Sequence, residues 1–244
     1  MIHWMKSRGR HGVIASLALL GGSQAFAVNY MEATINDSFI RGGNSSTMTH
    51  GTNNSLLIKD ASTNFSRKSL IQFDLSALGP VPASGGFLQL VISNNDQGGG
   101  GTTPQDYDVL LSRLNDGDPG ESWSETTVTW NNAPANDTGS NQNWLAANST
   151  PVTTQTILGS PVNSTLLIPL DSATIASING DSDGLITFLV ARDTLPGNGN
   201  NLGFYSKDQG VASRAPMLIL IPEPSRALLV AAGLGLIMLR RCRS

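Results

Sequence analysis

The segment Trp123-Ser-Glu-Thr-Thr-Val-Thr-Trp-Asn-Asn-Ala-Pro134 holds two of the four tryptophans of the chain. Side chains alternate between the two faces of a strand, so residues 127–130 are predicted as one strand with Val128 and Trp130 on the same face. The Asn-Asn pair and the proline that follow end it, because Asn favours turns and Pro cannot donate to a strand ladder. A large aromatic residue beside a chain-breaking loop predicts a lid on the end of a β-sandwich core. Stacking of a sugar ring on the two tryptophans is the alternative.

Short apolar or alternating runs recur along the body of the chain, with Gly, Asn, Asp and Pro between them. β-Branched and aromatic residues dominate these runs, and such runs between turn residues are typical of strands. Residues 172–178 are predicted as one or two helical turns, and 136–148 as a flexible surface loop. The pattern predicts an all-β domain, a single jelly-roll-type β-sandwich. The predicted strands are 33–40, 55–59, 69–74, 86–93, 107–114, 127–130, 154–158, 164–170, 184–192, 203–206 and 216–221.

The first 27 residues have the three parts of a secretory signal peptide. A basic segment precedes an apolar core at 13–20, and Ala25-Phe-Ala27 fits the small-residue cleavage pattern. The apolar core is too short to span a bilayer, because a core about 30 Å thick needs about 20 apolar residues. We therefore expect cleavage between Ala27 and Val28, and export of the protein. A retained membrane anchor is the alternative.

Residues 222–244 combine three features in order: the motif Pro222-Glu223-Pro224, an apolar helix at 226–239 and a basic tail at 240–244. This order resembles the PEP-CTERM sorting signal of exported proteins in Gram-negative bacteria. The resemblance implies transient anchoring in the inner membrane, processing by an exosortase near the motif, and transfer to the cell surface or the extracellular space. Under the positive-inside rule the basic tail stays cytoplasmic. A simple C-terminal tail anchor is the alternative.

Between these segments, residues 28–221 form one domain with eight Lys and Arg against seventeen Asp and Glu, a net charge of −9. This balance argues against a nucleic-acid partner, because such domains carry a basic stripe. The only cysteine is Cys242, so the domain has no disulfide and no thiol nucleophile. A Ser-His-Asp relay could use only His50, which lies in a Ser/Thr/Asn/Gly-rich loop. A glycosidase needs two acids at a defined separation, and Glu121 and Glu125, which flank Trp123, are the candidate pair. We therefore predict no catalytic residue.

Several short motifs follow one another in a fixed order over residues 33–220. The residues that mark them are Arg67, Phe73, Trp123, Glu125, Trp130, Pro134, Ser206, Lys207 and Pro216. This order resembles a DNRLRE-type domain, which is similar to disaggregatase-related repeats and to carbohydrate-binding module family 96. Characterised members of that module family bind alginate-type acidic polysaccharide. The resemblance implies a jelly-roll β-sandwich that acts as a binding or matrix module.

An acidic polysaccharide needs cations on the protein, and this domain offers few. Arg41, Lys59, Arg67, Lys207 and Arg214 are the candidate ligand contacts. A guanidinium in a groove can hold a carboxylate through two parallel hydrogen bonds. The alternative is that these side chains pair with the many aspartates of the domain.

Aspartate-rich loops of an exported domain are candidate calcium sites, because Ca²⁺ takes several oxygen ligands from flexible loops. One kind of candidate has two carboxylates two residues apart, as in Asp181-Ser-Asp183 and Asp116-Gly-Asp118. The other is Asp37 with Asp208, which meet if the first and last strands pair. The alternative is solvated turns. Structural calcium is the one cofactor that the sequence suggests.

Together these features predict an exported, non-catalytic surface or extracellular-matrix protein that contacts exopolysaccharide through its β-sandwich. A purely structural matrix component without a sugar site is the first alternative. A polysaccharide-degrading enzyme is the second.

Overall fold

The structure, a computed structural model, describes residues 29–61, 64–78, 82–95, 106–193 and 201–223. The expected signal peptide, with Ala25, Ala27 and Val28, lies outside the described residues, as does the sorting signal from Pro224 onward. In the part of the chain that is described, no helix is long and apolar enough to cross a membrane.

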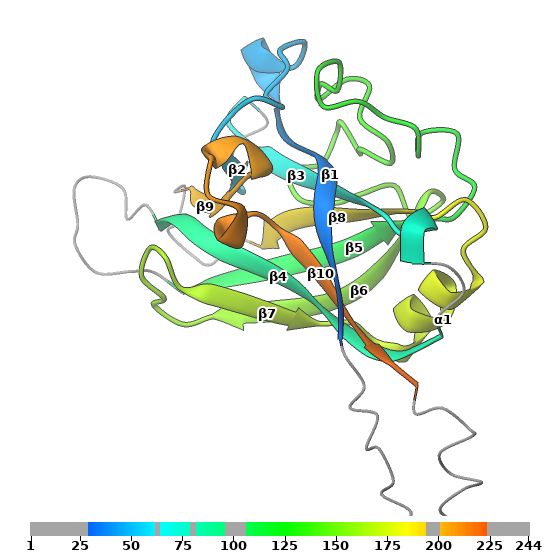
Figure 1. The fold of residues 1–244 in the computed structure, drawn as a ribbon. Helices are drawn as coiled ribbons and strands as arrows, with labels where there is room; N and C mark the ends of the chain where they lie inside the picture. Colours follow the sequence, from blue (N-terminus) through cyan, green and yellow to red (C-terminus); the bar gives the residue numbers. More distant parts are fainter. Residues whose placement is uncertain (1–28, 62–63, 79–81, 96–105, 194–200, 224–244) are drawn as a thin grey trace, which may run out of the picture.

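Nearly all regular structure is extended (Figure 1). Among the described residues, one α-helix lies between the seventh and eighth strands, and four short 3₁₀ turns lie in the connections. The elements are β1 (Tyr30–Arg41), η1 (Gly43–Ser45), β2 (Ser55–Ile58), β3 (Arg67–Asp74), η2 (Ser76–Leu78), β4 (Ala83–Asn95), β5 (Tyr107–Leu114), β6 (Ser149–Ile157), β7 (Thr165–Pro169), α1 (Ser172–Gly180), β8 (Leu185–Asp193), β9 (Leu202–Tyr205), η3 (Lys207–Gln209), η4 (Ala212–Arg214) and β10 (Met217–Pro222).

The strands form one antiparallel sheet in the order β2-β9-β4-β10-β1-β3-β8-β5-β6, with β7 paired to β4. The arrangement is sandwich-like, because one core cluster joins residues of β4, β7, β9 and β10 to residues of β3, β5 and β8. In that cluster the rings of Phe73 and Phe188 meet edge to face, with centroids 6.1 Å apart. The finer assignment as a jelly roll stays a prediction.

Strand β1 belongs to both halves of the sheet. Its first residues pair with β10, from Tyr30 opposite Leu220 to Ala33 opposite Met217. From Thr34 onward it pairs with β3, and the register shifts between Thr34 and Asn36. Such an irregularity bends a strand and increases its twist, which lets one strand serve two layers. The first and last strands are therefore neighbours, as the sequence analysis supposed.

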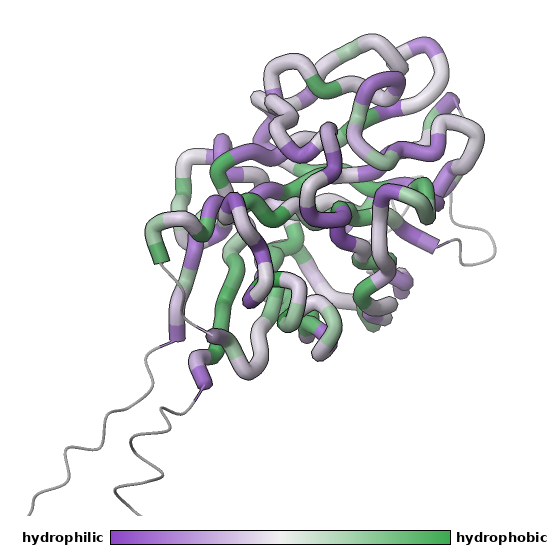
Figure 2. Tube along the Cα trace, turned by 90° about the vertical axis from the view of Figure 1, so that its right-hand side faces the viewer, coloured by the Kyte–Doolittle hydropathy of each residue, from purple (hydrophilic) through white to green (hydrophobic). Residues whose placement is uncertain are grey.

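Hydrophobic segments lie along the strands and hydrophilic ones gather in the outer turns (Figure 2). The helix α1 begins where the Asp171 side chain accepts a 2.8 Å hydrogen bond from the Thr174 N–H. This is the usual way to satisfy a free N–H group at a helix start. Ile175 and Ile178 then pack into the main core cluster, which closes one end of the sandwich.

Ten of the eleven predicted strands and the predicted helix are confirmed, with small differences at their ends. The strand predicted at 127–130 is wrong, because this segment is a series of turns. Its backbone bonds locally: the Val128 N–H donates to the Ser124 carbonyl, and the Thr129 N–H donates to the Asn132 side chain at 2.6 Å. A side chain that satisfies the backbone in this way competes with strand pairing.

Residues 115–148, which join β5 to β6, form a lid on one end of the sandwich (Figure 1, green). Val128 and Trp130 are each 3% exposed and pack on Ile40, Leu70 and Leu189 in a second core cluster. The part at 136–148, predicted as a flexible surface loop, is tied down by a β-bridge between Asn136 and Trp144. The predicted lid is therefore present, although it is built from turns and not from a strand.

Candidate functional site

Lys68 of β3 lies fully buried beneath the lid. Its ammonium nitrogen is 4.8 Å from the ring centre of Trp130 and 5.1 Å from that of Trp144. The same Nζ donates to Asn136 Oδ1 at 2.9 Å, to the Asp137 carbonyl at 3.1 Å and to the Asn143 carbonyl at 2.5 Å. Burial lowers the pKa of Lys68 to about 8, so it remains protonated at neutral pH. This ammonium holds the lid on the sheet.

The two signature tryptophans have different environments. Trp130 is 3% exposed and presents no face to a ligand, which rules it out as a platform for a sugar. Trp123 is only partly buried, donates from Nε1 to Thr187 Oγ1 at 3.2 Å, and lines a small cavity of about 270 Å³. Trp144 lines a larger groove of about 620 Å³ between the lid and the strands β5 and β6.

Residues Asp37, Glu125, Lys207 and Asp208, called the Asp37 cluster below, join the first strand, the lid and the turn before the last strand. Glu125 accepts from the Asp37 N–H at 3.3 Å and from Lys207 Nζ at 2.8 Å. Lys207 donates its backbone N–H to Asp37 Oδ2 at 2.8 Å, and its ammonium also lies 3.2 Å from Asp208. The structure thus brings Asp37 and Asp208 together, with the Lys207 ammonium as their cation.

Asp37 itself has no exposed surface, and its Oδ1 accepts no hydrogen bond within the described part of the chain. Burial raises the pKa of Asp37 to about 7, although the hydrogen bond from the Lys207 N–H lowers it. An aspartate in the unfolded chain titrates near its ordinary value of about 3.9. The folded protein therefore binds an extra proton between these two pH values.

This difference predicts that stability falls as pH rises from about 4 to about 7. Below pH 4 the carboxyl is protonated in both states, and above pH 7 it is ionised in both, so the loss is confined to that window. Between pH 4 and pH 7, we expect the free energy of unfolding of the wild type to fall by roughly 2–4 kcal/mol relative to that of the Asp37→Asn variant. Urea unfolding of both proteins at pH 4, 5.5 and 8 measures this, and equal pH profiles would contradict it.

A second surface, called the Phe65 surface, consists of Arg41, Lys59, Phe65 and Arg67. Arg41 ends β1 opposite Arg67, which begins β3, and Lys59 forms a β-bridge with Arg67. The Phe65 side chain is 50% exposed, with the Arg41 guanidinium carbon 5.7 Å and Lys59 Nζ 5.9 Å from its ring centre. Two of the five predicted ligand contacts therefore lie over an exposed aromatic ring, and a third, Arg67, is bonded to the carbonyl of the same residue.

Arg41 and Arg67 have little to neutralise them. Neither forms a salt bridge with a described residue, and the Nε of each is buried without a hydrogen-bond partner in the described part of the chain. Arg67 donates from Nη1 to the Phe65 carbonyl at 3.1 Å and to Asn201 Oδ1 at 2.9 Å. Arg41 and Arg67 stand opposite each other on β1 and β3, and burial, then the nearby Arg41, lowers the pKa of Arg67. Such a pair attracts an anion.

The remaining two predicted contacts lie elsewhere. Lys207 is engaged in the Asp37 cluster, and Arg214 lies over the ring of Tyr205 at 5.0 Å. Phe65, which lies in a turn two residues before Arg67, was not among the predicted ligand contacts. Its nearness to Arg67 and Lys68 in the sequence was the signal that could have found it.

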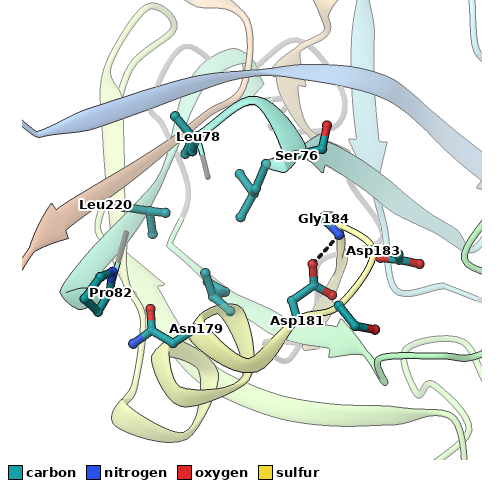
Figure 3. A pocket seen from close by; sticks show the side chains of 11 residues that line it. Ser76, Leu78, Pro82, Asn179, Asp181, Asp183, Gly184 and Leu220 are labelled. Atoms are coloured by element: carbon teal, nitrogen blue, oxygen red, sulfur yellow. Dashed lines mark hydrogen bonds between the residues drawn. The ribbon is translucent and has the colours of Figure 1, made fainter. Parts of the chain in front are cut away.

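Four carboxylates, Asp116, Glu121, Asp181 and Asp183, form a third group, called the Glu121 cluster. Burial, followed by the other acids of the group, raises the pKa of Glu121 to about 7 and that of Asp181 to about 6. Asp181 and Asp183 also line a cavity of about 470 Å³ (Figure 3). The hydrogen bond from the Gly184 N–H to Asp181 Oδ2 lies on one side of this cavity, and Leu78, Pro82 and Leu220 lie on the other.

The residues considered for catalysis do not meet. Glu121 belongs to the Glu121 cluster, whereas Glu125 is bonded to Lys207 in the Asp37 cluster. His50 stacks on Phe39, with ring centroids 4.1 Å apart, and burial together with Arg41 and Arg67 lowers its pKa.

The other residues that mark the family motifs lie in the core, in the lid or beside turns and strand ends. Phe73 is in the core, and Pro134 lies against Gly120 in the lid. Ser206 caps η3 and donates to the Asn53 carbonyl at 2.5 Å, and Pro216 directly precedes β10. Of the predicted processing motif, Pro222 ends β10 and the Glu223 N–H donates to the Pro82 carbonyl at 2.9 Å.

The described residues thus form a sandwich-like antiparallel fold that carries the Phe65 surface. The family model of carbohydrate-binding module family 96 matches residues 29–154, just over half of the 244 residues. The chain belongs to carbohydrate-binding module family 96. Residues after the match supply α1 and strands β7 to β10, which complete the sheet. No curated protein matches the chain.

Proposed function

We propose that this protein binds an acidic exopolysaccharide, and that the Phe65 surface holds it. The single observation that carries the proposal is the gathering of three cations around the half-exposed Phe65, in a domain of net charge −9. Arg41 and Lys59 lie over its ring, and Arg67 donates to its carbonyl. Membership of a carbohydrate-binding module family supports a saccharide ligand. The three cations favour an acidic saccharide at this surface. Elsewhere the domain carries an excess of negative charge, which repels a polyanion.

The chemistry of the surface suits a uronate chain. Guanidinium groups pair with carboxylates through charge-assisted, often bidentate hydrogen bonds. An exposed aromatic ring offers an apolar face for the C–H side of a pyranose. Neither Arg41 nor Arg67 forms a salt bridge with a described residue, so ligand carboxylates would reduce the repulsion between the two guanidinium groups. The module holds a polymer without changing it, in keeping with the separation of Glu121 and Glu125 into two different clusters.

The test is binding of the purified protein to polyguluronate, polymannuronate and polygalacturonate, measured by calorimetry, with a neutral glucan as control polymer. We expect uronate binding that weakens with salt, since exposed charge pairs are screened. Arg41→Gln, Arg67→Gln and Phe65→Ala should each weaken it about tenfold or more, because hydrogen bonds to charged groups contribute about 1.5–3 kcal/mol.

Arg214→Gln is the matched control, since it also removes one cation, but outside the Phe65 surface. Equal affinity in all variants would contradict the proposal, and loss of binding in Trp123→Ala alone would move the site to the lid. If the protein binds none of the acidic polymers, the alternative of a purely structural matrix component without a sugar site is favoured.

We further propose that the protein is exported and is then sorted by an exosortase to the cell surface or the extracellular space. The support is the sequence: the Ala25-Phe-Ala27 pattern, and the order of motif, apolar helix and basic tail after Pro222. The pairing of β1 with β10 places both ends of the described domain side by side. Mass spectrometry of the mature protein should find Val28 at its start and a C-terminus near residues 222–224; a chain that begins at Met1 would contradict export by this route.

A further inference from the structure

The groove between the lid and the strands β5 and β6, called the Trp144 groove below, shares no lining residue with the Phe65 surface. Its floor includes Leu110 of β5 and its cross-strand partner Thr154 of β6. Its wall is the end of the lid, with the partly buried Trp144 and the exposed Leu145. The volume of about 620 Å³ lies within the range of ligand-binding clefts, about 300–1,000 Å³.

The floor of the groove is open because β6 is an edge strand with an irregular ladder. Among the described strands, β6 pairs with β5 alone. The register shifts between Leu111 and Ser112, which leaves Val152 without a partner across the ladder. Such bulges bend a strand and are frequent next to active sites. Val152 and the preceding Pro151 both line the groove, so the bend helps to shape it.

The lining of the groove presents no positive charge. Asp137 is the one charged residue among the described residues that line it. Lys68 Nζ lies 5.1 Å from the centre of the Trp144 ring, but this side chain is fully buried and bonded to the lid. An acidic saccharide would therefore meet an aspartate here without a cation to offset it. The groove and the Phe65 surface thus differ in the charge that they accept.

Apolar and polar groups are combined in the lining, as a sugar requires. The indole of Trp144 and the side chain of Leu145 offer apolar surface. Ser112, Asn143 and Thr154 also line the groove, and their side-chain polar groups form no hydrogen bond with another described residue. A pyranose has C–H groups on its faces, which suit an indole, and hydroxyl groups around its edge, which suit free amide and hydroxyl groups.

We propose that the Trp144 groove binds a neutral sugar unit of a polysaccharide, separately from the Phe65 surface. All the residues that line the groove lie within residues 29–154, the segment matched by the carbohydrate-binding module family. The sugar lies with a C–H face against the indole of Trp144, and its hydroxyl groups bond to Asn143 and Thr154. Two sites with different charge preferences would let the module hold a polymer that contains both neutral and acidic units.

Calorimetric titration of the purified protein with neutral β-1,4-linked hexaoses of glucose, mannose and galactose tests the proposal. We expect a Kd of about 1 mM or tighter for at least one of these hexaoses. Because the groove presents no cation, the affinity should be the same at low and at high salt. It should also be unchanged in Arg67→Gln, which alters the Phe65 surface alone.

Thr154→Trp should abolish this binding, because the indole fills the groove. Thr154 is exposed on an edge strand, where a tryptophan is well tolerated, and an unchanged unfolding temperature confirms that the variant is folded. Thr165→Trp is the matched control, since it makes the same change at an exposed threonine of β7, outside the groove. Asn143→Ala should weaken binding about threefold or more, because it removes one hydrogen bond to the ligand.

Three results would overturn the proposal. The first is no heat with any of the hexaoses. The second is equal affinity in the wild type, Thr154→Trp and Asn143→Ala, or a loss of affinity in Arg67→Gln alone, which would place neutral sugars at the Phe65 surface. The third is a dimer in sedimentation that Thr154→Trp dissociates, which would assign the groove to a second copy of the chain. These measurements use no acidic polymer, so their outcome is separate from that of the uronate test.

Discussion

Replacement of Lys68 by methionine is expected to destabilise the protein by about 3–5 kcal/mol, in spite of the similar volume of the two side chains. The ammonium is the donor for three oxygens, from Asn136, Asp137 and Asn143. A buried acceptor that loses its donor costs about 1–3 kcal/mol. The cation also lies between the rings of Trp130 and Trp144, where desolvated cation–π contacts contribute about 2 kcal/mol.

Urea unfolding followed by tryptophan fluorescence measures this loss. Asn136→Ala alone, and together with Lys68→Met, completes a double-mutant cycle. Because the two side chains are bonded at 2.9 Å, their effects should be non-additive by about 1 kcal/mol or more. A Lys68→Met protein with the unfolding midpoint of the wild type would show that the lid does not depend on the ammonium.

Replacement of Trp130 by alanine is expected to lower the free energy of unfolding by about 3–5 kcal/mol. The indole is 3% exposed and fills the second core cluster beneath the lid, so its removal leaves a cavity between Leu70, Leu189 and the turns above them. It also removes one of the two rings beside Lys68. The lid should loosen before the sandwich unfolds.

Trp123→Ala is the matched comparison, because it removes the same side chain from a partly exposed position with one hydrogen bond. We expect it to cost less than half as much as Trp130→Ala in equilibrium unfolding. Hydrogen exchange should show lost protection in residues 115–148 for the Trp130 variant, while strands β3 and β8 stay protected. Equal destabilisation by the two variants would show that the burial of Trp130 does not govern the lid.

The strands could be predicted because their causes are local. A strand alternates its side chains, and in β2 the buried Leu56 and Ile58 alternate with partly exposed residues. Turn residues then fix where each strand ends. The failure at 127–130 has a local cause as well: Val128 and Trp130 alternate as in a strand, but Asn132 satisfies the backbone that a partner strand would have paired.

The candidate sites were only partly predictable. Arg41 and Arg67 could be named as cations from their residue types, but their meeting at Phe65 depends on the register of β1 against β3. Asp181 and Asp183 were predicted as metal ligands from their spacing. Asp116 was predicted in the same way, as a partner of Asp118, but it and Glu121 lie beside Asp183 because β5 pairs with β8.

The sequence by itself determined the all-β class, most strand positions and the family motifs, because these depend on periodicity, turn residues and contiguous motifs. Export and sorting remain predictions from the two ends of the sequence. The tertiary structure decided which charges are buried and which charges meet. Lys68 and Asp37 stand in strands whose pattern gives no sign of their burial, yet both have no exposed surface. Burial and the meeting of distant loops depend on strand order and on the lid that folds across it, and no local pattern encodes either one.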